Sequence, residues 1–131
     1  MPGISFWQMS HGILIVDDSS QIRNMVRLWL ETDDKFEVCG EAADGVEGIE
    51  KALELKPDLI VLDLLMPRMN GLQAAKALHS TMPEIPIILF TLFPDSELAN
   101  QARQAGISTV LSKMDQMSLL CDEVQKLVGR P

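Results

Sequence analysis

Five short apolar runs alternate with stretches of helical periodicity, and this alternation limits the fold more than any other feature of the chain. The apolar runs cover residues 12–16, 36–41, 58–63, 85–91 and 107–112. The stretches between them carry apolar residues three and four positions apart, as in Ile22, Met25, Val26, Trp29 and Leu30, which indicates amphipathic helices. Strands that alternate with helices form a parallel sheet through right-handed crossovers. We therefore expect a doubly wound five-stranded parallel α/β sheet, covered by helices on both faces.

Length and the N-terminal stretch indicate the domain organisation. A chain of 131 residues suits one domain. Because the first apolar run begins at Gly12, we expect an N-terminal extension over residues 1–11 and the domain over residues 12–131. The extension lacks the charged and long apolar regions of a signal peptide, and no apolar run approaches the roughly 20 residues of a membrane span. The expected compartment is the cytoplasm, with no membrane partner.

The charge and the two cysteines argue against several function classes. There are 19 acidic and 11 basic residues, a formal net charge of −8, and the lysines and arginines form no run. Because binding to nucleic-acid phosphates needs a concentrated basic face, we expect no direct nucleic-acid binding by this chain. Cys39 and Cys121 lie far apart among apolar residues. This placement is typical of packed thiols and does not suggest a disulfide framework or a zinc site.

Polar side chains stand at the ends of four predicted strands. The first strand is followed by Asp17 and Asp18, the third ends in Asp63, the fourth ends in Thr91, and Lys113 follows the fifth. In an open α/β sheet, ligands bind at the carboxyl ends of the strands, where the strand order reverses. We therefore expect three carboxylates, a hydroxyl and an ammonium group to meet at one edge of the sheet.

This set of groups has a defined chemical use. Clustered carboxylates raise one another's pKa unless a cation neutralises them, and hard oxygen ligands suit Mg²⁺. Beside the metal, a carboxylate stays ionised and can attack a phosphoryl group, whose other oxygens Thr91 and Lys113 could bind. Each residue alone has an ordinary explanation, such as Asp18 or Ser19 capping the next helix. Their conjunction favours a phosphoryl-transfer site.

Four segments carry a resemblance to a known family. They are residues 13–18 (ILIVDD), 57–71 (PDLIVLDLLMPRMNG), 87–91 (IILFT) and 111–113 (LSK). From about Gly12 to Val128, the chain resembles the receiver domain of bacterial two-component response regulators. The resemblance implies the flavodoxin-like (βα)5 fold with strand order 2-1-3-4-5. Residues 41–45 (EAADG) and 112–115 (SKMD) further resemble the class of receivers joined to a LuxR-type helix-turn-helix.

The resemblance also implies roles for the residues at the sheet edge. Asp63 would accept a phosphoryl group from a histidine kinase, Thr91 would turn toward the phosphate, and Lys113 would pair with it. The implied ligands of Mg²⁺ are Asp18, Asp63, the backbone carbonyl of Leu65 and, through water, Asp17. Such a domain is a signalling switch and not an enzyme.

The output of the implied switch would be the surface of the fourth helix, the fifth strand and the fifth helix. Phosphorylation would change this surface and so control an output such as transcription. Besides the kinase, the implied partners are a LuxR-type output domain outside these 131 residues and a second copy of the chain in a homodimer.

Three residues depart from the family pattern. Val110 replaces the tyrosine or phenylalanine that usually precedes the lysine by three residues and changes rotamer on activation. Leu92 replaces a small residue after the threonine, and Met114 replaces the proline that follows the lysine in many receivers. A cis bond before Met114 would cost about 2.5–4 kcal/mol, so we expect a trans bond. Together with Phe93 and Leu98, these residues are expected on or near the signalling surface.

These departures motivate a second hypothesis: a pseudo-receiver that acts as a phosphorylation-independent protein-interaction module. A phosphatase of the haloacid dehalogenase type is a third hypothesis, but such enzymes need a second aspartate where Leu65 stands. Dinucleotide binding is not expected, because residues 17–20 (DDSS) occupy the place of the glycine-rich phosphate loop.

Overall fold

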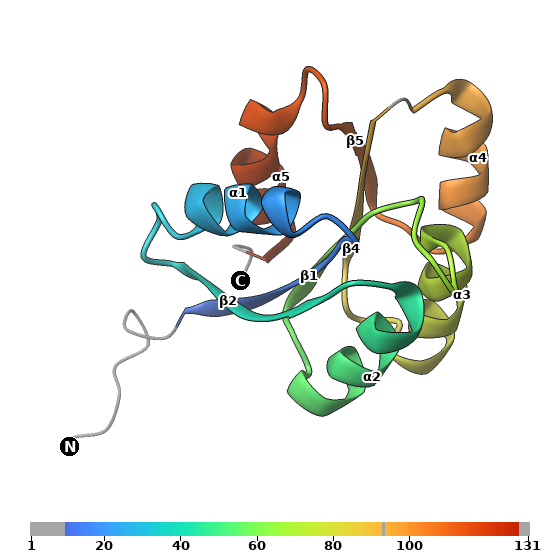
Figure 1. Ribbon diagram of the computed structural model, residues 1–131, viewed down its shortest axis with the longest axis horizontal. Helices are drawn as coiled ribbons and strands as arrows, with labels where there is room; N and C mark the ends of the chain where they lie inside the picture. Colours follow the sequence, from blue (N-terminus) through green and yellow to red (C-terminus); the bar gives the residue numbers. More distant parts are fainter. Residues whose placement is uncertain (1–9, 93, 129–131) are drawn as a thin grey trace.

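One parallel sheet of five strands, in the order β2-β1-β3-β4-β5, forms the centre of the computed structural model, which describes residues 10–92 and 94–128 (Figure 1). The strands are β1 (His11–Val16), β2 (Phe36–Ala42), β3 (Leu59–Leu62), β4 (Ile87–Thr91) and β5 (Thr109–Ser112). The helices are α1 (Ser20–Leu30), α2 (Gly45–Leu55), α3 (Gly71–Thr81), α4 (Ser96–Gln104) and α5 (Leu120–Val128), with a 3₁₀ turn at Met117–Leu119. The predicted fold and strand order are confirmed.

The sheet separates two hydrophobic clusters because alternate residues of each strand point to opposite faces. Ile13 and Ile15 of β1 pack with Val26 of α1 and Val124 of α5. The intervening β1 residues pack instead in a cluster that includes residues of α2, α3 and α4. Figure 1 shows the same division, with α1 and α5 on one side of the sheet and the other three helices on the opposite side. Burial on both faces explains why the strands read as continuous apolar runs.

Strand β2 contains an irregularity that changes which residues face α1. Ile13 of β1 lies opposite Val38, whereas the next residue, Leu14, lies opposite Gly40. Cys39 is therefore an extra residue in β2, which reverses the alternation of side chains beyond it. As a result, Glu41 bonds with arginines of α1, while Ala42 packs in the cluster on the other face.

Side-chain caps fix where the first four helices begin. Ser19 accepts a hydrogen bond from the backbone of α1, and Asp44, Asn70 and Asp95 do the same for α2, α3 and α4. Each cap satisfies a backbone N–H that the helix cannot pair internally. Ser19, rather than Asp18, is the N-cap of α1, which leaves the Asp18 carboxylate available for another role.

The start differs from the sequence prediction in four of the five strands, and β3 begins one residue later than expected, at Leu59. β4 and β5 begin two residues later than expected, because the preceding N–H groups are used in turns. Ile85 N–H donates to the carbonyl of Met82 at 3.2 Å, and Ile107 N–H donates to that of Ala102 at 2.9 Å. β1 begins at His11, one residue earlier than expected. The predicted extension stays a prediction, because residues 1–9 lie outside the described residues.

The inward stripe of α1 is narrower than the sequence indicated. Val26 and Leu30 are fully buried, but Met25 and Trp29 keep 37% and 41% of their surface exposed. The two cysteines are free and half-buried. None of the described helices is long and apolar enough to cross a membrane.

Candidate functional site

Three carboxylates meet where the two central strands of the sheet end. Val16 of β1 lies opposite Leu62 of β3, so Asp17 and Asp63 emerge side by side, and Asp18 follows on the same loop. Backbone bonds carry the sheet to this point, since Asp63 N–H donates to the carbonyl of Val16 at 2.9 Å. Each of the three residues offers a carboxylate oxygen, and these oxygens all lie within 4.8 Å of one another. The predicted convergence of the three carboxylates is confirmed.

Lys113 brings the ammonium group to the carboxylates from the edge strand β5. Its Nζ lies 2.6 Å from Asp17 Oδ2 and 3.2 Å from Asp63 Oδ1, and the side chain is only 7% exposed. Its backbone N–H donates to the carbonyl of Thr91 at 2.7 Å, which joins the end of β5 to the end of β4. A buried cation between two buried carboxylates offsets their repulsion.

The two oxygens of Asp63 have different surroundings. Oδ1 accepts a hydrogen bond from Leu64 N–H at 2.8 Å and also faces Lys113. No hydrogen bond to Oδ2 is found among the residues that the structure describes. Burial raises the pKa of the Asp63 carboxyl, and so does the charge of Asp17, while Lys113 and the Leu64 N–H only partly offset these effects. Ionisation of Asp63 therefore costs free energy in the folded protein, and a bound cation would lower this cost.

We expect Asp63→Asn to raise the stability of the metal-free protein at pH 7.5. In the folded state the pKa of Asp63 is raised, so its ionisation opposes folding at neutral pH. This penalty disappears when the carboxyl is protonated in both states, below the unfolded value of about 3.9. Thermal unfolding in EDTA should show a higher midpoint for the variant, with an advantage that shrinks on acidification. The exposed Asp34 gives the control Asp34→Asn, and a lower midpoint for Asp63→Asn at pH 7.5 would contradict the prediction.

The groups described above line a pocket of about 320 Å³. Its wall consists of Asp17, Asp18, Ser19, Ile22, Asp63, Leu65, Thr91, Leu92 and Lys113. All the predicted site residues are thus in one place. Leu65 and Leu92 are 74% and 48% exposed, so two leucines border the opening. In the sequence, Ser19 indicates only a helix cap, and nothing marks Ile22 as a site residue, because its spacing matches any inward position of a helix.

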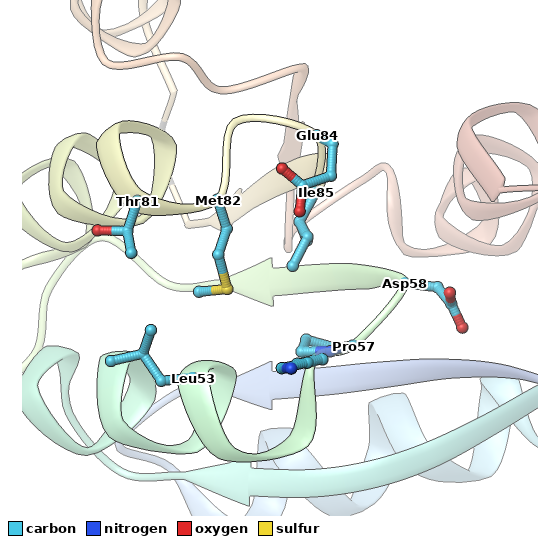
Figure 2. Close-up of a pocket in the computed structure, with 8 residues that line it drawn as sticks. Leu53, Pro57, Asp58, Thr81, Met82, Glu84 and Ile85 are labelled. Atoms are coloured by element: carbon cyan, nitrogen blue, oxygen red, sulfur yellow. The ribbon is translucent and has the colours of Figure 1, made fainter.

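A larger hollow lies at the opposite end of the sheet and has different chemistry. Its volume is about 540 Å³, and it lies between the ends of α2 and α3, before β3 and β4. Figure 2 shows the side chain of Met82 lying across from Leu53 and that of Ile85 across from Pro57, with the carboxylates of Asp58 and Glu84 pointing away from each other. Asp58 also accepts a hydrogen bond from Gly12 N–H at 2.7 Å. Size alone therefore does not identify the functional site, whereas converging charged groups do.

Only some of the residues predicted for the signalling surface are exposed. Leu92 and Met114 are exposed, at 48% and 65%, but Leu98 is 7% exposed and belongs to the core. Val110 is half-buried and packs against the cluster under α4, which favours a packing role for this side chain. Phe93 lies outside the described residues. The peptide bond before Met114 is trans, as expected.

The strand order and the acidic pocket at the carboxyl edge define a receiver-type signalling domain. The family model for the response regulator receiver domain matches residues 13–125. The chain therefore belongs to the response regulator receiver domain family of two-component signalling.

Known relatives agree with this assignment. The response regulator protein VraR of Staphylococcus epidermidis is 36% identical over 118 residues, which are 90% of this chain and 56% of VraR. The chain thus spans about half the length of the curated relatives that it matches. Among solved structures, a LuxR-family response regulator from Aurantimonas sp. SI85-9A1 has a TM-score of 0.87 at 30% identity, covering 92% of this chain and 87% of that one. The receiver domain of the regulator NarL from Mycobacterium tuberculosis has a TM-score of 0.87 at 26% identity, covering 94% and 99%.

Proposed function

We propose that Asp63 accepts a phosphoryl group from a histidine kinase in a reaction that depends on Mg²⁺. The observation that carries this proposal is the pocket in which Asp63 lies beside Asp17, Asp18 and Lys113. The phosphorylated domain would change the surface of α4, β5 and α5 and so control an output, transcription in the cytoplasm. The output domain would be a LuxR-type helix-turn-helix, a proposal that the similarity to a LuxR-family response regulator supports, and two copies of the receiver would form a homodimer.

The carboxylates fit Mg²⁺ in both chemistry and spacing. Opposite ligands of an Mg²⁺ octahedron lie about 4.2 Å apart, twice the Mg–O distance of about 2.1 Å. Carboxylate oxygens of Asp17, Asp18 and Asp63 within 4.8 Å of one another are close to this span. We propose direct bonds from Asp18, Asp63 and the backbone carbonyl of Leu65, and a bond through water from Asp17. When bound, the metal would neutralise the carboxylates and the charge on the phosphoryl oxygens.

Three residues of this chain would act directly in the transfer of the phosphoryl group. Oδ2 of Asp63 would attack phosphorus, forming an O–P bond while the N–P bond of the kinase phosphohistidine breaks and the leaving imidazole nitrogen takes up a proton from solvent. Lys113 would pair with one phosphoryl oxygen, and the hydroxyl of the buried Thr91 would donate to another. Both groups would stabilise charge that develops during the transfer.

The test is a mass measurement on the intact protein. Incubation with MgCl₂ and acetyl phosphate should add the mass of one phosphoryl group, and neither Asp63→Asn nor wild type in EDTA should gain it. Asp34→Asn, at an exposed position, controls for the loss of a carboxylate elsewhere. An undiminished gain in Asp63→Asn would show that another residue accepts the phosphate.

The half-exposed Leu92 at the pocket wall supports a second candidate, the pseudo-receiver. A bulky side chain at this place restricts access to the pocket, so the domain would bind its partner without phosphorylation. In that case the wild-type protein gains no mass. Its affinity for the partner would also be the same as that of Asp63→Asn.

A further inference from the structure

The loop between β1 and α1 holds its two aspartates in different ways. Asp17 is fixed through its side chain, since Oδ1 accepts from Ser19 N–H at 2.9 Å and Oδ2 accepts from Lys113 at 2.6 Å. Its own N–H donates to the carbonyl of Ala42 in β2 at 3.0 Å. Asp18 is exposed, and no hydrogen bond or ion pair to its carboxylate is found among the described residues. The backbone of the loop must therefore determine where the Asp18 carboxylate lies.

Arg23 of α1 holds this backbone. Its Nη1 donates to the carbonyl oxygen of Asp17 at 2.7 Å, and its Nε donates to Glu41 Oε1 at 2.8 Å. The guanidinium thus connects the loop to the end of β2, and the side chain is 19% exposed. Hydrogen bonds from a charged donor are stronger than neutral ones, and the rigid fork of arginine can bond both acceptors at once.

The carbonyl of Asp17 controls the position of Asp18 because of peptide geometry. The C=O of Asp17 and the N and Cα of Asp18 lie in one rigid plane. A donor that fixes the carbonyl oxygen therefore also fixes the orientation of the peptide plane to which Cα of Asp18 belongs. We infer that Arg23 is a positioning residue for the metal site: by holding the Asp17 carbonyl, it orients Asp18 toward the cation. This inference rests on the proposed function, since it assigns the role relative to Mg²⁺.

Simple electrostatics predicts the opposite effect, which makes the inference testable. A cation near three carboxylates repels Mg²⁺, so losing the charge of Arg23 would strengthen metal binding if charge were all that mattered. Glu41 lies between Arg23 and Arg27. Burial raises the pKa of Glu41, but hydrogen bonds from Arg27 and Arg23 outweigh burial and hold this pKa below its usual value. The charge of Arg23 is therefore largely neutralised by an ionised partner, and its bond to the loop is the feature that remains.

Arg27 provides a matched control one turn further along α1. Its Nε and Nη2 both donate to Glu41 Oε2, at 2.9 and 2.5 Å, but no bond from Arg27 to the β1–α1 loop is found in the described part of the chain. Arg27→Gln therefore removes the same charge and bonds to the same carboxylate without releasing Asp17. Arg23→Lys keeps the charge but offers one nitrogen, which cannot reproduce the bridge.

The experiment is a calorimetric titration of MgCl₂ into the 131-residue chain and its variants. Arg23→Gln should weaken Mg²⁺ binding by about tenfold, as losses of supporting residues around metal ligands do, and Arg23→Lys should weaken it too. Arg27→Gln should stay within about twofold of wild type, although both glutamine variants lose thermal stability through the broken ion pair. Amide hydrogen exchange in the peptide containing Asp18 should speed up in Arg23→Gln only.

The outcomes separate this inference from the proposed function. Equal or tighter Mg²⁺ binding by Arg23→Gln, or an equal loss in Arg27→Gln, would overturn the positioning role while Mg²⁺-dependent phosphorylation could still hold. A wild-type protein that binds no Mg²⁺ would reject the proposed function, and the role of Arg23 with it.

Discussion

Lys113→Ala is expected to slow phosphate uptake from acetyl phosphate by about a hundredfold or more, the usual loss when a charge-stabilising donor is removed from a reaction site. The ammonium is buried and within 3.2 Å of the Asp63 carboxylate. It would therefore face the phosphoryl oxygens throughout the transfer. A side chain that only filled space would leave the rate nearly unchanged.

The Mg²⁺ affinity of the same variant should not fall. Lys113 lies 2.6 Å from Asp17 Oδ2, so it competes with a metal cation for the acidic pocket, and its removal should leave Mg²⁺ affinity equal or higher. The two readouts are the rate of mass gain at saturating MgCl₂ and the calorimetric affinity. Lys126→Ala, at an exposed lysine paired with Glu123, should alter neither. A rate for Lys113→Ala within a few-fold of wild type would exclude a role in the transfer.

Gly71→Ala should destabilise the protein by about 3 kcal/mol or more, because it overpacks a site with no room to yield. A Cβ at Gly71 would clash with the backbone carbonyl oxygen of Asp63 and would lie 3.0 Å from both the Asp63 carbonyl carbon and Leu64 Cα. These are backbone atoms at the end of β3, and the N–H of Gly71 also donates to the Leu64 carbonyl at 2.7 Å. Relief of the clash must displace either the start of α3 or the backbone of Asp63, the residue that we propose as phosphoacceptor.

Urea unfolding followed by circular dichroism measures this effect. Gly12→Ala is the control, since its Cβ would lie 3.4 Å from the sulfur of Cys39 and meet no closer atom. This change should cost less than about 1 kcal/mol, as an ordinary substitution does. If Gly71→Ala were no less stable than Gly12→Ala, the close approach of α3 to the end of β3 would be wrong.

The sheet could be predicted from the sequence because its central strands are buried on both faces. β3 and β4 are buried at every residue, and such strands leave continuous apolar runs that stand out between helices. The misplaced starts of β4 and β5 have a different origin. Ile85 and Ile107 are apolar like strand residues, but their N–H groups bond to the preceding helical turn, and a hydrogen-bond partner cannot be read from residue type.

The residues of the site that could be predicted are those whose positions the strand topology alone determines. Parallel strands bring their carboxyl ends to one edge whatever the side chains do, so Asp63, Thr91 and Lys113 followed from strand order. The contact of Arg23 with the Asp17 carbonyl could not be foreseen. The second bond of Arg23, to Glu41, follows from the extra residue Cys39, which turns Glu41 toward α1, whereas regular alternation would have placed Glu41 on the other face.

The acidic pocket draws its groups from four strands, and the last of these, β5, pairs with β4 at the edge of the described sheet. During synthesis, Lys113 can reach Asp17 only after nearly the whole domain has left the ribosome and β5 has docked. The two residues are 96 positions apart, so their ion pair closes one of the longest loops in the fold. If Asp63 is the phosphoacceptor, a nascent or truncated chain without β5 would not take up phosphate, so phosphate uptake would require the complete fold.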